Sequence, residues 1–436
     1  MCKFNLMKTL INPPYSDWEQ YCERPVFPAE DLEEKVTDVL EEVRLKGDVA
    51  LKRLTSVFDQ VTLENIKVSF EETEKAKSEV SEELQQAIAV AADNIRTFHS
   101  AQQITEATVE TMPGIKCWRK SVAIEKVGLY IPGGSAPLFS TILMLGIPAL
   151  IAGCRQIVLC TPPDRNGNIN SAVLYTASFL GITEIYKVGG AQAIAAVAYG
   201  TDTIPKVDKI FGPGNQYVTK AKELVQKSGI AIDLPAGPSE VLVIADSSAD
   251  ADFVASDLLS QAEHGPDSQV VLLSDSAAFV ANVKDALTEQ LKLLPRASVA
   301  EQALHNSFSV VLNSVSECID FSNLYAPEHL ILAVEDAEGY ADQIQNAGSV
   351  FLGNYSCESA GDYASGTNHT LPTNGYARSY SGVSLDSFVK KITFQNLSKE
   401  GIQNIGRSIE VMAEAEQLSA HKNAVSIRLK KIQNEK

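Results

Sequence analysis

The feature that most constrains this 436-residue chain is a regular alternation of short apolar segments with helical ones, which begins near residue 122. In the first series the apolar segments are VGLYIP, QIVLCTPP, EIYKVGG and KIFGPGN; a second series runs through EVLVIAD, QVVLLSD, SVVLN, HLILAV and GSVFLG. Short strands that alternate with helices form parallel βαβ units, whose sheets are covered on both faces. The sequence therefore predicts an α/β protein.

The two series predict two doubly wound, incomplete Rossmann-like domains with mostly helical N- and C-terminal segments. We expect an N-terminal arm over residues 1–27 and a discontinuous first α/β domain over 28–121 and 239–383. The second α/β domain is expected over 122–238. The pattern after about Leu385 is purely helical, which makes 384–436 a C-terminal helical segment.

Charge and composition narrow the class of protein. The chain has 37 basic and 55 acidic side chains, a net charge of −18, which argues against nucleic-acid binding. The uncharged run between Lys126 and Arg155 is long enough to span a membrane, but glycines and Pro148 interrupt it. We therefore expect a buried helix there and no membrane span. Seven scattered cysteines without a C-x-x-C pair, and a start without a secretory signal, predict a cytoplasmic protein.

Three glycine turns follow predicted strands: PGGSAP at 132–137, GGAQ at 189–192 and GPGN at 212–215. Such turns at the carboxyl ends of parallel strands allow backbone amides to approach a phosphate group. None of them has the complete G-x-G-x-x-G spacing of a dinucleotide site. On spacing alone, a dinucleotide site and tight structural turns both remain open.

The segment SSADADFVASDLLSQAEHGPDSQ predicts a helix that ends near a metal-binding pair. Gln261 and His264 are three residues apart and share one face of its last turn. The partial negative charge of a helix C-terminus favours a cation there, although a helix-terminal histidine such as His264 is more often a simple cap. Downstream candidates near helix ends or in a glycine-rich loop are Asp362, His369, Glu416 and His421. Spacing alone does not join these residues into one site.

The segment YAPEHLILAV contains a candidate acid–base pair, Glu328 and His329. Neighbouring residues in a regular strand point to opposite faces of the sheet. Pro327 suggests a strand entrance, where irregular backbone could direct both side chains into one cleft. Histidine titrates near neutral pH and is a natural general base. The alternative is a surface acid beside a packed strand histidine.

The chain resembles the histidinol dehydrogenase family over about residues 25–430. The resemblance rests on eight ordered blocks: VGLYIPGGSAPLFSTILM, VGGAQAIAA, VDKIFGPGNQYVT, DLPAGPSEVLVIAD, SQAEHGPDSQ, YAPEHL, GDYASGTNHTLPT and SAHKNAV. It implies an NAD-dependent enzyme with one Zn²⁺ per subunit. It also implies the reaction, a four-electron oxidation of L-histidinol through L-histidinal to L-histidine, the last steps of histidine biosynthesis.

The resemblance further implies a role for each matching residue. The zinc ligands would be Gln261, His264, Asp362 and His421. His329 would be the general base, and Glu328 would activate a water molecule. NAD would contact Tyr130, Gln192 and Asn215. Ser239, Glu416 and His369 would hold L-histidinol, together with His329 and the zinc ligands. The family is a homodimer, so His421 and Glu416 of the 384–436 segment would complete the partner subunit's site.

Three other interpretations compete with this one. Aldehyde oxidation commonly passes through a cysteine thiohemiacetal, which makes Cys154 and Cys160 alternative nucleophiles. Both lie in apolar sequence, which favours inert core thiols. A metal-dependent hydrolase would use Glu328 to activate water and would need no nicotinamide. A non-enzymatic relative would bind small ligands without turnover.

Overall fold

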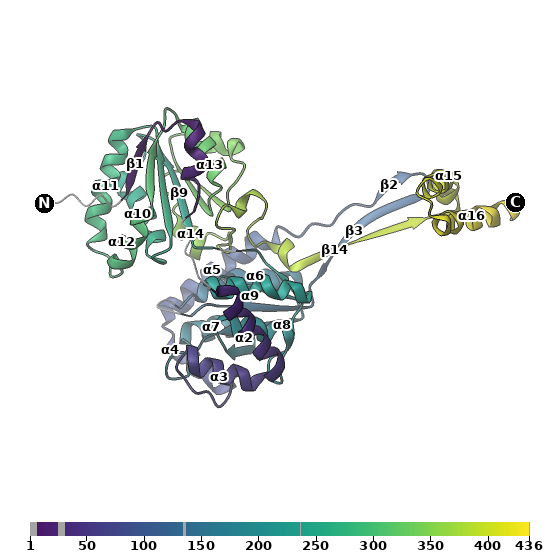
Figure 1. Cartoon of the computed structure of the whole chain (residues 1–436), viewed down its shortest axis with the longest axis horizontal. Coiled ribbons are helices and arrows are strands. Elements are labelled where there is room, and N and C mark those ends of the chain that lie inside the picture. Colours follow the sequence, from purple (N-terminus) through teal and green to yellow (C-terminus); the bar gives the residue numbers. More distant parts are fainter. Residues whose placement is uncertain (1–6, 25–30, 134–136, 236, 436) are drawn as a thin grey trace.

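Two parallel sheets covered by helices lie side by side, and a long arm extends from one of the two units (Figure 1). This architecture comes from a computed structural model, which describes residues 7–24, 31–133, 137–235 and 237–435. The predicted α/β class, with two parallel-sheet units, is confirmed.

The first unit contains a six-stranded sheet with the order β1-β11-β10-β9-β12-β13, and all of its strand pairs are parallel. Its strands are β1 (Lys8–Ile11), β9 (Glu240–Ala245), β10 (Gln269–Ser274), β11 (Phe308–Val311), β12 (His329–Ala333) and β13 (Ser349–Leu352). The helices α10 (Ala251–Ala262), α11 (Ala277–Leu291) and α12 (Ala297–His305) cover one face. The helices α1 (Trp18–Tyr21) and α13 (Val315–Tyr325) cover the other. Strands β9, β10 and β12 are buried along their whole length, because helices cover both faces.

The second unit contains a five-stranded parallel sheet with the order β6-β5-β4-β7-β8. Its strands are β4 (Lys126–Tyr130), β5 (Gln156–Thr161), β6 (Glu184–Lys187), β7 (Lys209–Phe211) and β8 (Ala231–Ile232). Its inner helices are α6 (Phe139–Ala152), α7 (Ser171–Phe179), α8 (Gly190–Tyr199) and α9 (Gln216–Val225). The second half of the uncharged run forms a helix, α6, that is buried from Ser140 to Ala149, as expected. Among the described residues, no helix is both long and apolar enough to cross a membrane.

Four early helices correct the expected domain division. They are α2 (Leu32–Lys46), α3 (Asp48–Phe58), α4 (Phe70–Glu79) and α5 (Glu82–Ser100). We expected residues 28–121 to join 239–383, but these helices pack on the five-stranded unit: α4 and α5 over α6 and α7, and α2 and α3 over α8 and α9. The physical reason is that α8 is apolar all round, with Ala191–Ala198 buried, and a helix of this kind needs a further layer outside it.

The N-terminal segment is more than the arm predicted for residues 1–27. Strand β1 is an edge strand, in which Lys8 pairs with Phe308 and Ile11 with Val311. Lys284 on α11 fixes this strand by donating a hydrogen bond to the Met7 carbonyl oxygen at 2.6 Å. Residues 1–6 and 25–27 of the predicted arm lie outside the described residues.

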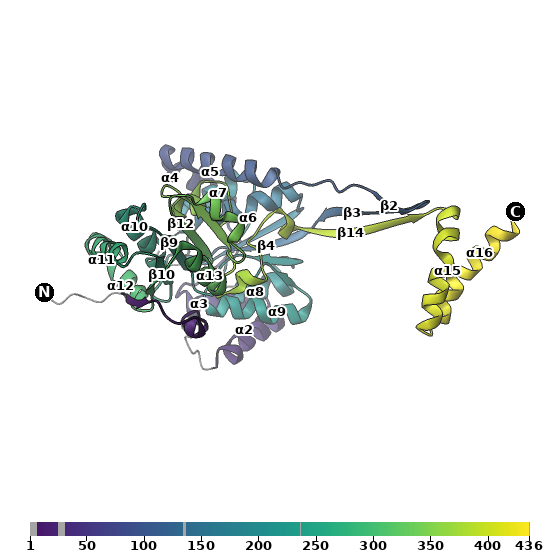
Figure 2. The same cartoon turned by 90° about the horizontal axis from the view of Figure 1, so that it is seen from above.

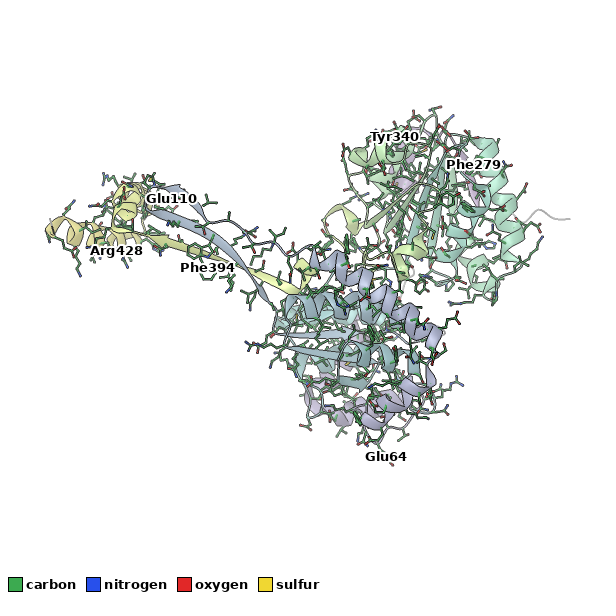
Figure 3. The ribbon with its side chains drawn as sticks, turned by 180° about the vertical axis from the view of Figure 1, so that it is seen from behind. Glu64, Glu110, Phe279, Tyr340, Phe394 and Arg428 are labelled. Carbon is green, nitrogen blue, oxygen red and sulfur yellow. The ribbon has the colours of Figure 1, made fainter. Side chains whose placement is uncertain are left out.

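The C-terminal segment is not purely helical. Strand β14 (Val389–Leu397) pairs antiparallel along its full length with β3 (Ile115–Ala123), and β2 (Val109–Met112) flanks β3. Only then follow α15 (Lys399–Ala415) and α16 (Ser419–Asn434), at the far end of the ribbon (Figure 2). Within VKKITFQNL only Ile392 and Phe394 alternate with polar residues, and Phe394 stacks across the strands on Trp118 with ring centroids 5.4 Å apart. Figure 3 shows Phe394 and Arg428 on this arm, away from the two parallel sheets.

Short elements complete the chain. The helix α14 (Glu358–Tyr363) follows β13. The 3-10 helices are η1 (Tyr15–Asp17), η2 (Gln226–Ser228), η3 (Glu338–Gln343), η4 (Tyr376–Arg378) and η5 (Leu385–Phe388). At the root of the arm, Phe388 stacks on Phe211 of β7 with centroids 4.1 Å apart, which attaches the ribbon to the five-stranded core.

Candidate functional site

A cleft of about 1810 Å³ lies between the two sheet units. The five-stranded unit contributes the carboxyl ends of β4, β6 and β7, as expected for the glycine turns. The six-stranded unit contributes the amino ends of β9 and β12. The cleft therefore lies between the carboxyl ends of the strands of one sheet and the amino ends of the strands of the other. The candidate residues that line it are Tyr130, Gln192, Asn215, Ser239, His264, Glu328, His329, Asp362 and His369.

The turn at 189–192 is tight because backbone and side chains approach it closely. Gly190 has φ 64°, and its N–H donates to the Tyr130 hydroxyl at 3.1 Å. A side chain at Gly189 would clash with Pro162. Gln192 is almost fully buried in the first turn of α8 but lines the cleft. The backbone amides at the start of α8 thus lie beside the cleft, next to two of the predicted NAD contacts.

The turn at 212–215 is held by a buried ion pair. Gly212 has φ 125°, its N–H donates to Asp233 Oδ2 at 2.7 Å, and its carbonyl accepts from Lys222 Nζ at 2.9 Å. Lys222 and Asp233 also pair with each other. Asn215 then begins α9, accepting backbone N–H groups at 3.1 and 3.2 Å. Of the first predicted turn, 132–137, residues 134–136 lie outside the described part of the chain.

Gln261, His264 and Asp362 form a candidate metal centre. Gln261 is fully buried at the end of α10, with Nε2 3.2 Å from His264 Nδ1. Its Oε1 is buried and has no hydrogen-bond partner among the described residues. His264 is exposed to the cleft, and partial desolvation by the surrounding protein lowers its pKa from the usual value. An orphaned amide oxygen, a neutral imidazole and a carboxylate are donors that suit a divalent cation, so these residues fit such a group.

Carboxylates surround His329. Its Nδ1 donates to the Glu240 carbonyl oxygen at 3.1 Å and lies 3.7 Å from Glu328 and 3.8 Å from Glu358. Its Nε2 lies 3.5 Å from Asp362 Oδ1. Burial disfavours the charged imidazole, but the neighbouring carboxylates outweigh it and raise the pKa of His329 to about 10. The hydrogen bond from Nδ1 leaves Nε2 to carry the lone pair whenever the ring is neutral.

Glu328 and His329 both face the cleft because the backbone before them is irregular. Ala326, directly after α13, has φ 55°, a left-handed conformation, and Pro327 follows it. The expectation that both side chains line one cleft is confirmed. Burial raises the pKa of Glu328 to about 8, and its Oε2 accepts from the Glu240 N–H at 2.8 Å.

Two buried acids were missed in the sequence. Glu358 lies four residues before Asp362 on α14, is almost fully buried, and burial raises its pKa well above the usual range. With His329 and Asp362 it could hold a metal ion, since one donor atom of each lies within 4.8 Å of the others. Asp257 lies four residues before Gln261 on α10, and burial raises its pKa to about 7. The i,i+4 spacing from a candidate ligand is the signal that could have identified both acids.

His369 links the two sheet units. Its Nδ1 lies 2.9 Å from the Asp362 carbonyl oxygen, and its Nε2 lies 3.2 Å from the hydroxyl of Thr141 on α6. Both ring nitrogens therefore already have partners. Ser239, directly before β9, lines the cleft as predicted for a substrate contact.

Glu416 and His421 do not join these residues within one chain. Both are exposed, one at the end of α15 and the other on α16. These helices lie at the tip of the arm, far from both parallel sheets of the same chain (Figure 2), whose residues line the cleft.

Comparisons with known proteins agree on one family. A sequence model described as histidinol dehydrogenase matches residues 22–429. The chain is 55% identical to histidinol dehydrogenase of Bacteroides thetaiotaomicron, over 97% of this chain and 99% of the relative. It is 54% identical to that of Escherichia coli strain K12, over 93% of each chain. A crystal structure of histidinol dehydrogenase from Elizabethkingia anophelis superimposes with a TM-score of 0.97 at 61% identity, covering 98% of this chain and 99% of that one. The resemblance found in the sequence is confirmed, and the chain belongs to the histidinol dehydrogenase family.

Proposed function

We propose that this protein oxidises L-histidinol through L-histidinal to L-histidine with two molecules of NAD, the last steps of histidine biosynthesis. As a member of its family the chain is an NAD-dependent oxidoreductase. The observation that carries the proposal for this site is the orphaned Gln261 oxygen next to His264, which lines the same cleft as Asp362 and His329. This arrangement supports a metal-binding set beside a general base.

Gln261, His264 and Asp362 would hold one Zn²⁺, and His421 of a second copy of the chain would supply the fourth ligand. A nitrogen and two oxygens from one chain leave room for the imidazole and amine nitrogens of the substrate. When bound, the cation would orient the substrate and offset the charge of Asp362, which would lower the pKa of His329 towards the range of a working base.

Tyr130, Gln192 and Asn215 would bind NAD across the ends of β4, β6 and β7. The tight turns at Gly189 and Gly212 bring backbone amides and the amino ends of α8 and α9 to the cleft, as dinucleotide phosphates require. NAD bound there would accept one hydride in each oxidation.

His329 Nε2 would take the proton of the substrate hydroxyl as the hydride leaves. Its Nδ1 is fixed by the Glu240 carbonyl, so the ring is held in the tautomer that leaves Nε2 free. Glu328 would activate the water that adds to the aldehyde, and His329 would accept a proton again in the second oxidation. Ser239 and His369 would help to hold L-histidinol, since both line the same cleft.

We propose a homodimer with shared sites, in which the arm of each chain reaches the cleft of the other. Supporting this, Glu416 and His421 are exposed at the end of a long ribbon and have no role in the cleft of their own chain. The arm also exposes large apolar side chains, among them Met412 (64%) and Ile427 (57%), which a second copy would cover. The partner would then bring Glu416 to the substrate and His421 to the metal.

The test is absorbance at 340 nm after the purified protein is mixed with NAD and L-histidinol. We expect two NADH per histidinol, and loss of turnover after exhaustive chelation. Replacement of His329 by Asn should lower turnover by about 10²–10⁴-fold with the metal retained, while the exposed His305→Asn control should match the wild type. Product without NAD would indicate the hydrolase, and metal binding without any turnover would indicate the non-enzymatic relative.

A further inference from the structure

Arg24, at the end of the described N-terminal segment, makes an unusually complete set of buried contacts. Its side chain is 10% exposed. Its Nε and Nη2 donate to the two carboxylate oxygens of Glu240 at 2.8 and 2.9 Å. Its guanidinium carbon lies 3.4 Å from the centre of the Tyr325 ring, and its Nη1 donates to the Cys22 carbonyl at 2.9 Å. The Tyr325 ring covers the face of the guanidinium and Glu240 pairs with its edge, so the group is held in one orientation.

Glu240 connects this arginine to the acid–base pair. Its carboxylate is 2% exposed and also accepts the backbone N–H of Asn374 at 2.9 Å. Its own peptide groups contact the pair directly. The Glu240 N–H donates to Glu328 Oε2 at 2.8 Å, and the Glu240 carbonyl accepts from His329 Nδ1 at 3.1 Å. A shift of Glu240 would therefore move the hydrogen-bond partners of both groups at once.

Arg24 also contacts the backbone that delivers the pair to the sheet. Its Nη2 donates to the carbonyl of Ala326 at 3.4 Å, the residue whose left-handed conformation ends α13. Tyr325, under the guanidinium, is fully buried and donates to Gln269 Oε1 at 2.7 Å. Arg24 thus links the entrance of β9 to the entrance of β12, the two neighbouring strands whose amino ends form this part of the cleft.

We propose that Arg24 is a positioning residue for the oxidation: acting through Glu240 and Ala326, it sets the geometry of Glu328 and His329. This inference rests on the proposed function. A buried ion pair is often replaceable by apolar packing with little loss of stability, so its contribution to fold stability alone does not explain this arrangement. Mutation of a residue that supports functional groups through their hydrogen-bond partners commonly lowers activity by about 10–100-fold.

The test compares Arg24→Met and Arg24→Lys with Lys284→Met in the zinc-loaded, full-length protein. Lys284 fixes the same N-terminal segment, through Met7 and Thr9, but is remote from the acid–base pair. Turnover is measured per folded, zinc-containing subunit, with L-histidinol and with substrate deuterated at the carbinol carbon. For Arg24→Met we expect kcat to fall about 10–100-fold, the KM for histidinol to change less than about threefold, and the deuterium isotope effect on kcat to rise.

The conservative variant provides the second readout. Arg24→Lys keeps the charge but loses the paired donors, so it should recover part of the lost kcat, and Lys284→Met should keep the wild-type kcat and isotope effect. An unchanged kcat per folded subunit, or an unchanged isotope effect for Arg24→Met, overturns the proposal. If Arg24→Met does not fold, Glu240→Gln replaces it under the same criteria. Failure of the wild type to oxidise histidinol would refute the proposed function itself, which separates the two outcomes.

Discussion

Replacing Gln261 by Met should make the metal-free protein as stable as the wild type or more stable, while weakening metal binding. Gln261 is fully buried, and its Oε1 has no hydrogen-bond partner among the described residues. A buried acceptor of this kind costs about 1–3 kcal/mol, and methionine of similar length removes that cost. The variant loses one hydrogen bond, between Gln261 Nε2 and His264 Nδ1, with a net value of about 0.5–1.5 kcal/mol. The sum ranges from about 0.5 kcal/mol against the variant to about 2.5 kcal/mol in its favour.

Zinc should shift the comparison in favour of the wild type. Loss of one of three ligands from the same chain is expected to weaken binding by at least about tenfold, or about 1.4 kcal/mol. Because a ligand that binds only the folded state stabilises it by mass action, the stabilisation by zinc should shrink by the same amount. The stability of the variant relative to the wild type should therefore be lower with zinc than with chelator, by at least about 1.4 kcal/mol.

The assay is denaturant unfolding of both proteins, once with chelator and once with a fixed excess of zinc. A matched control is Gln269→Met, because Gln269 is also buried but has both amide atoms bonded, to Tyr325 and to the Asn306 carbonyl. Gln269→Met should lose stability in both conditions, by about 1–3 kcal/mol. The reasoning is refuted if chelated Gln261→Met is more than about 1 kcal/mol less stable than the wild type, or if its zinc affinity is unchanged.

Three further predictions concern the cysteines, a glycine turn and a buried histidine. Burial raises the pKa of Cys154 to about 11 and of Cys160 to about 12, so neither is a thiolate at neutral pH. Changing each to Ala should therefore leave kcat within about twofold of the wild type. A folded variant with kcat reduced about a hundredfold would instead support the thiohemiacetal mechanism. Gly212→Ala, at φ 125°, places a methyl group against the Tyr130 carbonyl oxygen, so calorimetry should show NAD binding at least about tenfold weaker. Gly153→Ala, at φ 86° with open space around it, is the control and should keep the wild-type affinity for NAD. Burial lowers the pKa of His99 to about 4 from an ordinary 6.5. Between these pH values the unfolded state binds more protons than the folded state, so the stability of the fold decreases as the pH falls. The free energy of unfolding should therefore be about 2 kcal/mol lower at pH 5 than at pH 7, and this difference should be absent in His99→Phe.

Much of the fold could be predicted because its signals are local. The predicted segments VGLYIP, QVVLLSD and HLILAV form β4, β10 and β12, since buried parallel strands have continuous apolar runs bounded by turns. Strand β14 was missed because its apolar residues do not alternate regularly with polar ones, and its stabilising contacts come from β3, far away in the sequence. The same limit applies to helices α2 to α5, whose amphipathic pattern shows a buried face but not the sheet it covers.

The candidate site shows the same division between local and long-range information. The pairing of Gln261 with His264 was readable from helical spacing, and the shared cleft of Glu328 and His329 from Pro327 at a strand entrance. The approach of Asp362 to His329 was not readable, because it depends on how α14 returns to the sheet after β13. Only the family resemblance connected these residues before the structure did. Arg24 had no sequence signal, since its role arises from a contact with Glu240, 216 positions later.

The pairing of β1 with β11 sets the order in which this protein can assemble. Lys8 lies opposite Phe308, so β1 cannot pair with β11 until about three hundred further residues have been synthesised. All strands of the five-stranded sheet have been made once Ile232 has emerged, whereas the six-stranded sheet still lacks β9 to β13 at that point. Chains emerge from the ribosome N-terminus first, and closing so long a loop is slow. We therefore expect the opening segment to dock late, so that the acid–base pair gains its arginine support only as synthesis nears its end.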